Sequence, residues 1–291
     1  DKVPVVEAIS GDRALEVRWM RRFGSPVHAV AVAEGASEGR ILAAVGRRVH
    51  VMRRDAVTET LLDAGYSSGR LVPTPIDGEG GFDVLAFRLG GERVSRFGFP
   101  DATQTEWTAP APVFDAQWTD PADPAAGAVV GTLDGIVRVD AEGTFESIAD
   151  LGLVRGILAA RDGWLVLSGR DERRLQVFSA QFEQTEEIPL PAAPWRLGAA
   201  APGGRAGLYS NRVKAAAVGR FFPDLETEQV ALATATALVI LDGTDGRELY
   251  RVVWEGIGDV AAGDSDGDGT DELVVSWGNR ALALGLPGTF D

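Results

Sequence analysis

The sequence predicts an all-β chain folded as a β-propeller. Short apolar runs recur at intervals of about 40 residues, each full unit holds about four such runs, and one strand-like segment stands alone before the first unit. Runs of this length, rich in Val, Ala, Leu and aromatic residues and separated by Gly or Asp-Gly, are typical of strands. Four short strands in about 40 residues make one propeller blade.

The strands of the units follow in a regular order. The first run of each unit comes before a polar loop, the second after it, the third follows a tight turn, and a more polar fourth closes the unit. The first runs are residues 29–33, 71–76, 113–118, 154–158, 195–199, 213–218 and 257–261. The second runs are 41–45, 84–87, 128–132, 164–168, 230–234 and 273–277, and the third are 49–52, 93–97, 136–139, 175–178, 238–241 and 281–284.

The last unit ends after its third strand, whereas residues 15–23 form a strand-like segment with no unit of its own. We therefore expect this N-terminal strand to complete the last blade and close the ring, which removes exposed sheet edges. We expect one domain over residues 1–291, with residues 1–26 as closing strand and linker. Its repeats start near residues 27, 71, 113, 154, 195, 213 and 257.

The number of blades is ambiguous because residues 195 and 213 both look like unit starts but lie close together. One interpretation is seven blades, of which the one beginning near residue 195 is truncated. The alternative is six blades with residues 191–212 as an insertion. The sequence favours seven.

Composition excludes several classes of function. The chain has no cysteine, so thiol catalysis, disulfides and zinc–thiolate or iron–sulfur sites are ruled out. The net charge of −15 repels phosphate backbones, so we expect no nucleic-acid partner. No apolar run approaches the roughly 20 residues of a transmembrane helix. We expect a chain that is monomeric by itself or part of a larger assembly.

Residues 263–275 contain the strongest motif in the chain. Carboxylates at loop positions 1, 3 and 5, a glycine at position 6, a main-chain carbonyl at position 7 and an acid at position 9 can converge on one cation. A shell made only of oxygen suits Ca²⁺ rather than zinc or copper. The predicted calcium ligands are Asp264, Asp266, Asp268, the Thr270 carbonyl and Glu272, with Asp271 as an additional candidate.

This loop, followed by residues 272–275 (Glu-Leu-Val-Val) and placed between the first two strands of a repeat, resembles the FG-GAP or VCBS repeat of integrin-α-like β-propellers. The resemblance implies calcium sites in such loops. It also implies an exported protein of the periplasm, cell surface or extracellular space that binds other macromolecules. An EF-hand would need flanking helices and an acid at position 12, where Val275 stands.

Two further loops keep part of the pattern. Asp77, Glu79 and Asp83 retain positions 3, 5 and 9, which predicts a weaker second calcium site, although Pro75 replaces the acid at position 1. In the loop of residues 220–228, only positions 5 and 9 of the motif's acids survive, and Arg220 occupies position 1. We expect that loop to hold no metal.

Other residues permit functional interpretations that we judge weaker than structural ones. Residues 65–69 (Gly-Tyr-Ser-Ser-Gly) match a serine-hydrolase nucleophile pattern, but a linker between blades explains them better, because no helix is expected after them. His28 and His50 are expected to be structural or surface residues. Seven tryptophans are expected mainly in the core between blades, and an N-terminal group of arginines on a solvated face. These are Trp19, Trp107, Trp118, Trp164, Trp195, Trp254 and Trp277, and Arg18, Arg21, Arg22, Arg47, Arg48, Arg53 and Arg54.

The sequence therefore predicts a non-catalytic, calcium-binding β-propeller that serves as a protein- or glycan-interaction or scaffold module of an exported or envelope protein. No catalytic residue is assigned. The alternative is a calcium-supported propeller enzyme that cleaves a polysaccharide as a glycosidase or lyase, because a propeller can gather acids from distant loops at its axis.

Overall fold

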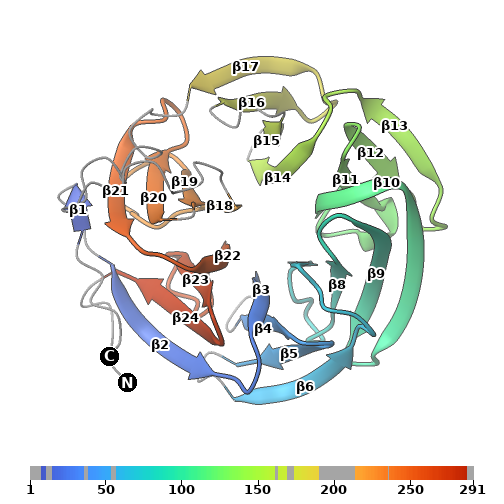
Figure 1. Cartoon of the computed structure of the whole chain (residues 1–291), viewed down its shortest axis with the longest axis horizontal. Helices are drawn as coiled ribbons and strands as arrows, with labels where there is room; N and C mark the ends of the chain where they lie inside the picture. The colour runs from blue at the N-terminus through green and yellow to red at the C-terminus, as the bar shows by residue number, and fades with distance from the viewer. Residues whose placement is uncertain are drawn as a thin grey trace.

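The protein is a β-propeller, as predicted. The computed structural model describes residues 8–10, 15–35, 39–53, 57–160, 163–168, 174–189, 214–234 and 236–286. Within these ranges every regular element is a β-strand except the short 3₁₀ helix η1 (Pro124–Ala126). The same residues include no helix long and apolar enough to cross a bilayer. The antiparallel sheets stand around a common axis as blades (Figure 1).

The first three blades follow one another directly. Blade 1 consists of β3 (Val27–Ala33), β4 (Arg40–Val45), β5 (Arg48–Met52) and β6 (Thr58–Asp63). Blade 2 consists of β7 (Arg70–Pro73), β8 (Phe82–Phe87), β9 (Gly91–Phe99) and the first part of β10 (Thr103–Trp118). Blade 3 consists of the second part of β10, β11 (Ala128–Thr132), β12 (Ile136–Val139) and β13 (Phe145–Ala149).

The last three blades complete the ring. Blade 4 consists of β14 (Val154–Ala160), β15 (Gly163–Ser168), β16 (Arg174–Ser179) and β17 (Gln184–Pro189). Blade 5 consists of β18 (Ala215–Gly219), β19 (Gln229–Ala233), β20 (Ala237–Asp242) and β21 (Glu248–Val253), with β1 (Ala8–Ser10) added at its outer edge. Blade 6 consists of β22 (Ile257–Gly263), β23 (Glu272–Trp277), β24 (Arg280–Gly285) and β2 (Glu16–Arg22).

The burial of each strand follows its place in the blade. Middle strands such as β20 are buried at every residue because neighbouring blades cover both faces, and they read as continuous apolar runs. Outer strands such as β6 alternate between exposed residues and residues that are partly or, at Leu62, fully buried. Strand β10 differs from the expected pattern, because it forms the outer strand of blade 2 and then the inner strand of blade 3 without interruption, joining both blades in one seven-stranded sheet.

The predicted ring closure is confirmed. Strand β2 pairs antiparallel with β24, with Glu16 opposite Gly285 and Arg22 opposite Arg280. The first and last parts of the chain therefore share blade 6, and β22 lies against β3 of blade 1 (Figure 1). The short strand β1, which pairs with β21, was not predicted.

The expected count of seven blades is corrected to the six-blade alternative. The described strands make six blades, and the inner strand of blade 4, β14, contacts the inner strand of blade 5, β18, directly. Because these inner strands are neighbours, no further blade fits between them. The segment that suggested the extra repeat, which starts near residue 195, lies outside the described residues.

One buried arginine connects the six blades at the axis. Arg70, the first residue of β7, donates from Nε to Asp115 Oδ1 of β10 and from Nη1 to Asp259 Oδ1 of β22, each at 2.8 Å. Its Nη2 also donates to the Ala216 carbonyl of β18 at 3.4 Å. One side chain thus contacts the inner strands of blades 3, 5 and 6 from blade 2.

The two aspartates extend this network to the remaining blades. Asp259 Oδ2 accepts the main-chain N–H of Val30 in β3 at 3.0 Å, and Asp115 Oδ2 accepts that of Ile157 in β14 at 2.8 Å. Every inner strand therefore supplies one partner. The network satisfies main-chain groups on inner strand edges that have no neighbouring strand.

The network holds its charges in a buried environment. Burial raises the pKa of Asp115 and of Asp259, and the Arg70 guanidinium acts in the opposite direction on both. Burial by itself would lower the pKa of Arg70, but the two carboxylates outweigh this effect and raise it. Arg70 therefore stays charged, and removing it would leave two carboxylates buried without their cation.

We expect Arg70→Leu to lower the free energy of unfolding by about 3–5 kcal/mol, because it breaks a buried ion-pair network from one side. Urea unfolding followed by tryptophan fluorescence measures this loss. Arg96→Leu is a matched control. Its partner Asp83 is 20% exposed at the side chain, against 1% for Asp115, and we expect a loss of about 1 kcal/mol. Equal losses for both variants would contradict a special role of the axial network.

Candidate metal site on the loop face

The predicted calcium motif forms the loop between β22 and β23, at the end of the inner strand of blade 6. The register pairs Gly263 with Glu272 at the base of this loop. Gly267 and Gly269 have φ values of 80° and 83°, a region that glycine adopts without strain. Residues 264–271 therefore make the tight turn that the motif requires.

The loop brings three of the predicted ligands together. One carboxylate oxygen from each of Asp264, Asp266 and Asp268 lies within 4.8 Å of the others, and the described residues contain no other such group of three. Asp264 also accepts N–H groups of the loop, from Gly267 at 2.6 Å and from Gly269 at 2.9 Å. These bonds orient the carboxylate before any cation binds.

Glu272, the predicted ligand at position 9, stabilises the loop through hydrogen bonds to Ser265. It lies outside the group of three aspartates, and its side chain is buried. Its Oε2 accepts the main-chain N–H of Ser265 at 2.9 Å and the Ser265 hydroxyl at 2.5 Å. Burial raises the pKa of Glu272 to about 7, with a further contribution from Asp266 and Asp268, against the lowering effect of Ser265.

Both neighbouring blades contact this loop. Asp271 Oδ2 accepts the Arg220 N–H of blade 5 at 2.6 Å, so this additional ligand candidate links two blades. Glu34 of blade 1 lies beside the base of the loop, where its Oε1 would be 3.1 Å from a Cβ added to Gly263. Burial and the charges of Asp271 and Asp264 raise the pKa of Glu34. Sequence reasoning missed Glu34, since only ring closure places the first blade beside the last.

The weaker second site is not assembled. Asp83 forms a two-point ion pair with Arg96, at 3.2 and 2.9 Å, so its carboxylate already has a cation. Asp77 Oδ1 accepts the N–H groups of Glu79 and Gly81 and stabilises its own turn. Asp77, Glu79 and Asp83 do not form a close group of ligand atoms among the described residues.

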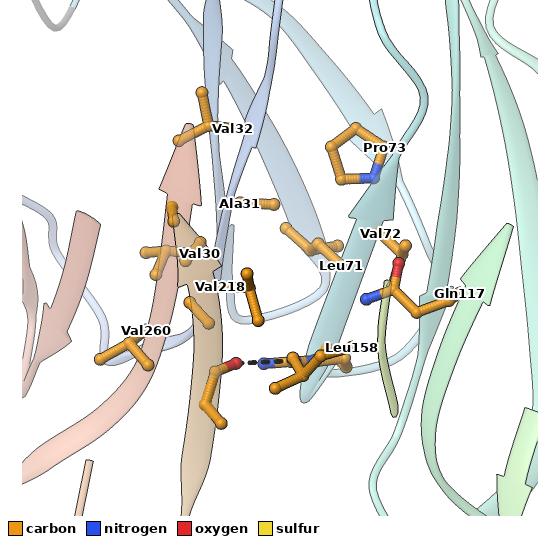
Figure 2. A pocket seen from close by; sticks show the side chains of 15 residues that line it. Val30, Ala31, Val32, Leu71, Val72, Pro73, Gln117, Leu158, Val218 and Val260 are labelled. Carbon is orange, nitrogen blue, oxygen red and sulfur yellow. Dashed lines mark hydrogen bonds between the residues drawn. The ribbon is translucent and has the colours of Figure 1, made fainter. Parts of the chain in front are cut away.

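The axis holds a cavity of about 210 Å³. Its walls are mainly Val, Ala and Leu side chains of the inner strands, and Gln117 is a polar residue among them (Figure 2). Arg70 lines it too. All four carboxylate oxygens of Asp115 and Asp259 accept hydrogen bonds within the axial network.

The serine-hydrolase pattern lies in the linker between β6 and β7, as expected. The chain on both sides of residues 65–69 is β-strand, so the strand–turn–helix of a nucleophile elbow is missing at this place. Ser68 is buried. Tyr66 donates from its hydroxyl to the Ala86 carbonyl at 2.6 Å, which holds the linker against blade 2.

The two histidines occupy positions of different kinds. His50 lies edge-on to Phe23, with ring centroids 5.0 Å apart, and its Nδ1 is 3.4 Å from the Thr58 hydroxyl. Burial, together with Arg21 and Arg48, lowers the pKa of His50. His28 is exposed on the inner strand β3. The contacts of His50 fit a structural residue, and the position of His28 fits a surface residue.

The described tryptophans lie mainly in the core. Trp107, Trp118, Trp164 and Trp254 are buried, and Trp19 and Trp277 are partly buried in clusters between blades; Trp195 lies outside the described residues. No described tryptophan is exposed as a platform for stacking sugars.

The arginine group is partly brought together. Arg21 and Arg48 both act on His50, and Arg21 lies over the Phe23 ring. Arg47 and Arg53 are near Asp63 and Glu59 of β6. Arg18 and Arg22 lie on β2, whereas Arg54 is outside the described residues. Arg21, Arg47, Arg48 and Arg53 therefore lie beside acids or aromatic rings of the same face.

Comparisons with known proteins show the fold. The WD40 domain of Neurospora crassa Pan2 has a TM-score of 0.54 and 8% identity, covering 98% of this chain and 99% of that one. BBS1N, from a crystal structure in complex with ARL6DN soaked with lead, has a TM-score of 0.53 and 10% identity, covering 87% and 76%. No family model matches the chain, and no curated protein matches it in sequence. At these identities the neighbours establish a propeller architecture alone.

We expect Glu272→Leu to lower the free energy of unfolding by about 1–3 kcal/mol, because it leaves the Ser265 N–H and hydroxyl buried without an acceptor. Glu272→Gln keeps an acceptor and should lose less. Urea unfolding in chelator at pH about 3.5 isolates this effect, since the carboxyl is then mostly protonated both in the folded state, where its pKa is about 7, and in the unfolded state, where an ordinary Glu has a pKa of about 4.3. A Leu variant as stable as the wild type would show that the bond to Ser265 does not hold the loop.

Proposed function

We propose that this β-propeller is a non-catalytic, calcium-binding module that binds a protein or glycan partner, as part of an exported or envelope protein. The observation that carries the proposal is the group of Asp264, Asp266 and Asp268, whose ligand atoms lie within 4.8 Å of one another in a loop at the end of an inner strand. Three carboxylates so close repel one another in the absence of a cation.

The donor set fits calcium. The three aspartates offer hard oxygen atoms, and Asp264 is already oriented by two loop N–H groups. In the proposal the Thr270 carbonyl and the second oxygen of Glu272 complete the shell. Bound calcium would neutralise the carboxylates and fix the loop. The chain's own residues would then connect it to blade 5 through Asp271 and Arg220, and to blade 1 through Gly39, whose N–H donates to the Ser265 carbonyl at 3.3 Å.

The interaction role is supported by the rigid scaffold and by the face that carries this loop. We call this the loop face: the loops that join the first and second strands of the blades. A propeller holds such loops on a fixed platform, where they present a broad surface to a macromolecule. The similar BBS1N structure was solved in complex with ARL6DN. The resemblance of residues 264–275 to FG-GAP or VCBS repeats supports export and calcium binding.

The absence of catalysis is part of the proposal. Asp115 and Asp259, the buried acids at the axis, use all four oxygens to join inner strands, so neither is placed as a general acid or base. A polysaccharide-cleaving enzyme of the kind considered from sequence would need a different pair of acids.

We expect about one equivalent of Ca²⁺ to bind chelator-stripped protein in isothermal titration and to raise the melting temperature, with a much weaker response to Mg²⁺. Asp266→Ala together with Asp268→Ala should abolish the binding heat and the calcium-dependent stabilisation while leaving the chain folded. The reason is that the ring is held by apolar packing and by Arg70.

Asp120→Asn with Asp123→Asn is the matched control. Both aspartates orient turn N–H groups in the loop after β10, as Asp266 and Asp268 do in theirs, but they are not part of the grouped ligands. This control should bind calcium as the wild type does. Loss of binding in both double variants, or no binding in the wild type, would refute the site.

We expect no product from a panel of plant, bacterial and animal polysaccharides assayed for new reducing ends and for unsaturated ends in calcium buffer. Chelator-treated protein is the reference, since the alternative is a calcium-supported enzyme. Product formed by the wild type in calcium and lost in chelator would establish the enzyme alternative.

A further inference from the structure

A second pocket lies on the loop face, between blades 2 and 3, and its lining residues are far in sequence from the calcium motif. Its volume is about 470 Å³, within the usual range of small-ligand pockets. It is bordered by the loop after β7, the turn between β9 and β10, and the loop after β10. The function described above does not use it.

The pocket has rigid walls. Phe82 and Phe99 line it, but their rings pack against each other, with centroids 4.8 Å apart, and against blade 1 in the core. Pro75, Pro121 and Pro124 add rigid apolar walls. Such walls lose little conformational entropy when a partner side chain packs on them.

The polar groups of the pocket are acidic. Asp77, Asp83 and Asp101 line it, and no lysine, arginine or histidine does. Arg96 already neutralises Asp83 in their two-point pair. Asp77 Oδ1 accepts turn N–H groups, but these bonds leave its negative charge in place. Asp101 is exposed on its turn. Two carboxylate charges therefore border the pocket without a lining cation.

The surrounding face has the same sign of charge. Main-chain bonds link neighbouring loops of the loop face, from Ser265 to Gly39 and from Glu34 to Ile76. The described residues of these loops include twelve acids and one base, Arg220. The acids are Glu34, Asp77, Glu79, Asp120, Asp123, Asp224, Glu226, Glu228, Asp264, Asp266, Asp268 and Asp271.

We propose that the pocket between blades 2 and 3 receives an arginine side chain from a basic segment of a partner protein. A guanidinium donates charge-assisted N–H bonds to carboxylates, and the apolar stem of an arginine packs well against walls such as the prolines. The protein already uses such an ion pair beside the pocket, where Arg96 donates to Asp83 and lies over Trp118, 5.6 Å from the ring centroid. Complementary charge on the whole face favours such a segment over an acidic or neutral one.

This inference deepens the proposed interaction role, since it names the chemistry of the partner and the place of contact. It does not depend on calcium. A protein that binds calcium but not a basic peptide would refute this inference alone, and one that binds the peptide but not calcium would refute the calcium site alone.

Fluorescence anisotropy with a short labelled peptide, arginine among glycine and alanine, tests the proposal. Its control peptide carries citrulline, which has nearly the same shape but no charge, in place of arginine. We expect the arginine peptide to bind at least about tenfold more tightly than the citrulline peptide, with an affinity that falls as salt rises. Equal binding of both peptides would overturn the proposal.

Variants locate the contact. Asp101→Asn removes a charge whose carboxylate lines the pocket, and should weaken binding of the arginine peptide about fivefold. Glu142→Gln, in the exposed turn of blade 3 outside the pocket, should leave binding unchanged. Both variants should keep the melting temperature of the wild type, so that a loss of binding is not a loss of fold.

The same titration on Asp266→Ala with Asp268→Ala, run in chelator, separates the two parts of the loop face. Unchanged peptide binding in this double variant supports the pocket as the site. Peptide binding that is lost there but kept in Asp101→Asn would place the contact at the loop of residues 264–271 and overturn the proposal.

Discussion

The architecture depends on one buried cation. A propeller places the inner edges of its inner strands around a common axis, where main-chain groups have no neighbouring strand to pair with. The planar guanidinium of Arg70 donates hydrogen bonds to two carboxylates and one carbonyl, which lie on three other blades. Asp115 and Asp259 then accept main-chain N–H groups from blades 4 and 1, the two blades that Arg70 does not contact. These hydrogen bonds hold the inner strands of all six blades together at the axis.

Ring closure has a second consequence, because it determines which loops become neighbours. Pairing of β2 with β24 brings blade 1 against blade 6, so that Glu34 and Gly39 lie beside the loop of residues 264–271. Blade 5 reaches the same loop through Arg220. The grouped aspartates are thus part of a continuous acidic surface that spans several blades. The axial charges, by contrast, are enclosed and serve the fold.

The acids of this chain therefore fall into two groups, buried acids and solvent-facing acids. Buried acids at the axis and beneath the loop face are satisfied by Arg70, by N–H groups or by Ser265, and they stabilise the scaffold. Acids at the ends of the strands keep their charge toward solvent, where they can attract a hard cation or a basic partner. A pocket with proline walls lies on this surface between blades 2 and 3.

The sequence by itself determined the strands of the repeats, the closing role of residues 15–23 and the turn that gathers Asp264, Asp266 and Asp268. These depend on local periodicity and on residues a few positions apart. It did not determine the blade count, because residues 195–212 share the composition of a repeat start, and composition does not specify which strands become neighbours. Tertiary structure alone decided that Glu272 turns inward to Ser265 and that Asp83 is paired with Arg96. It likewise decided that Glu34 and the axial network of Arg70, Asp115 and Asp259 come together. The partners of Glu34 and of the axial residues are separated by many residues, and only the closed ring brings them together. Ser265 and Arg96 lie near Glu272 and Asp83 in sequence, so in these two pairs strand pairing and burial select the contact.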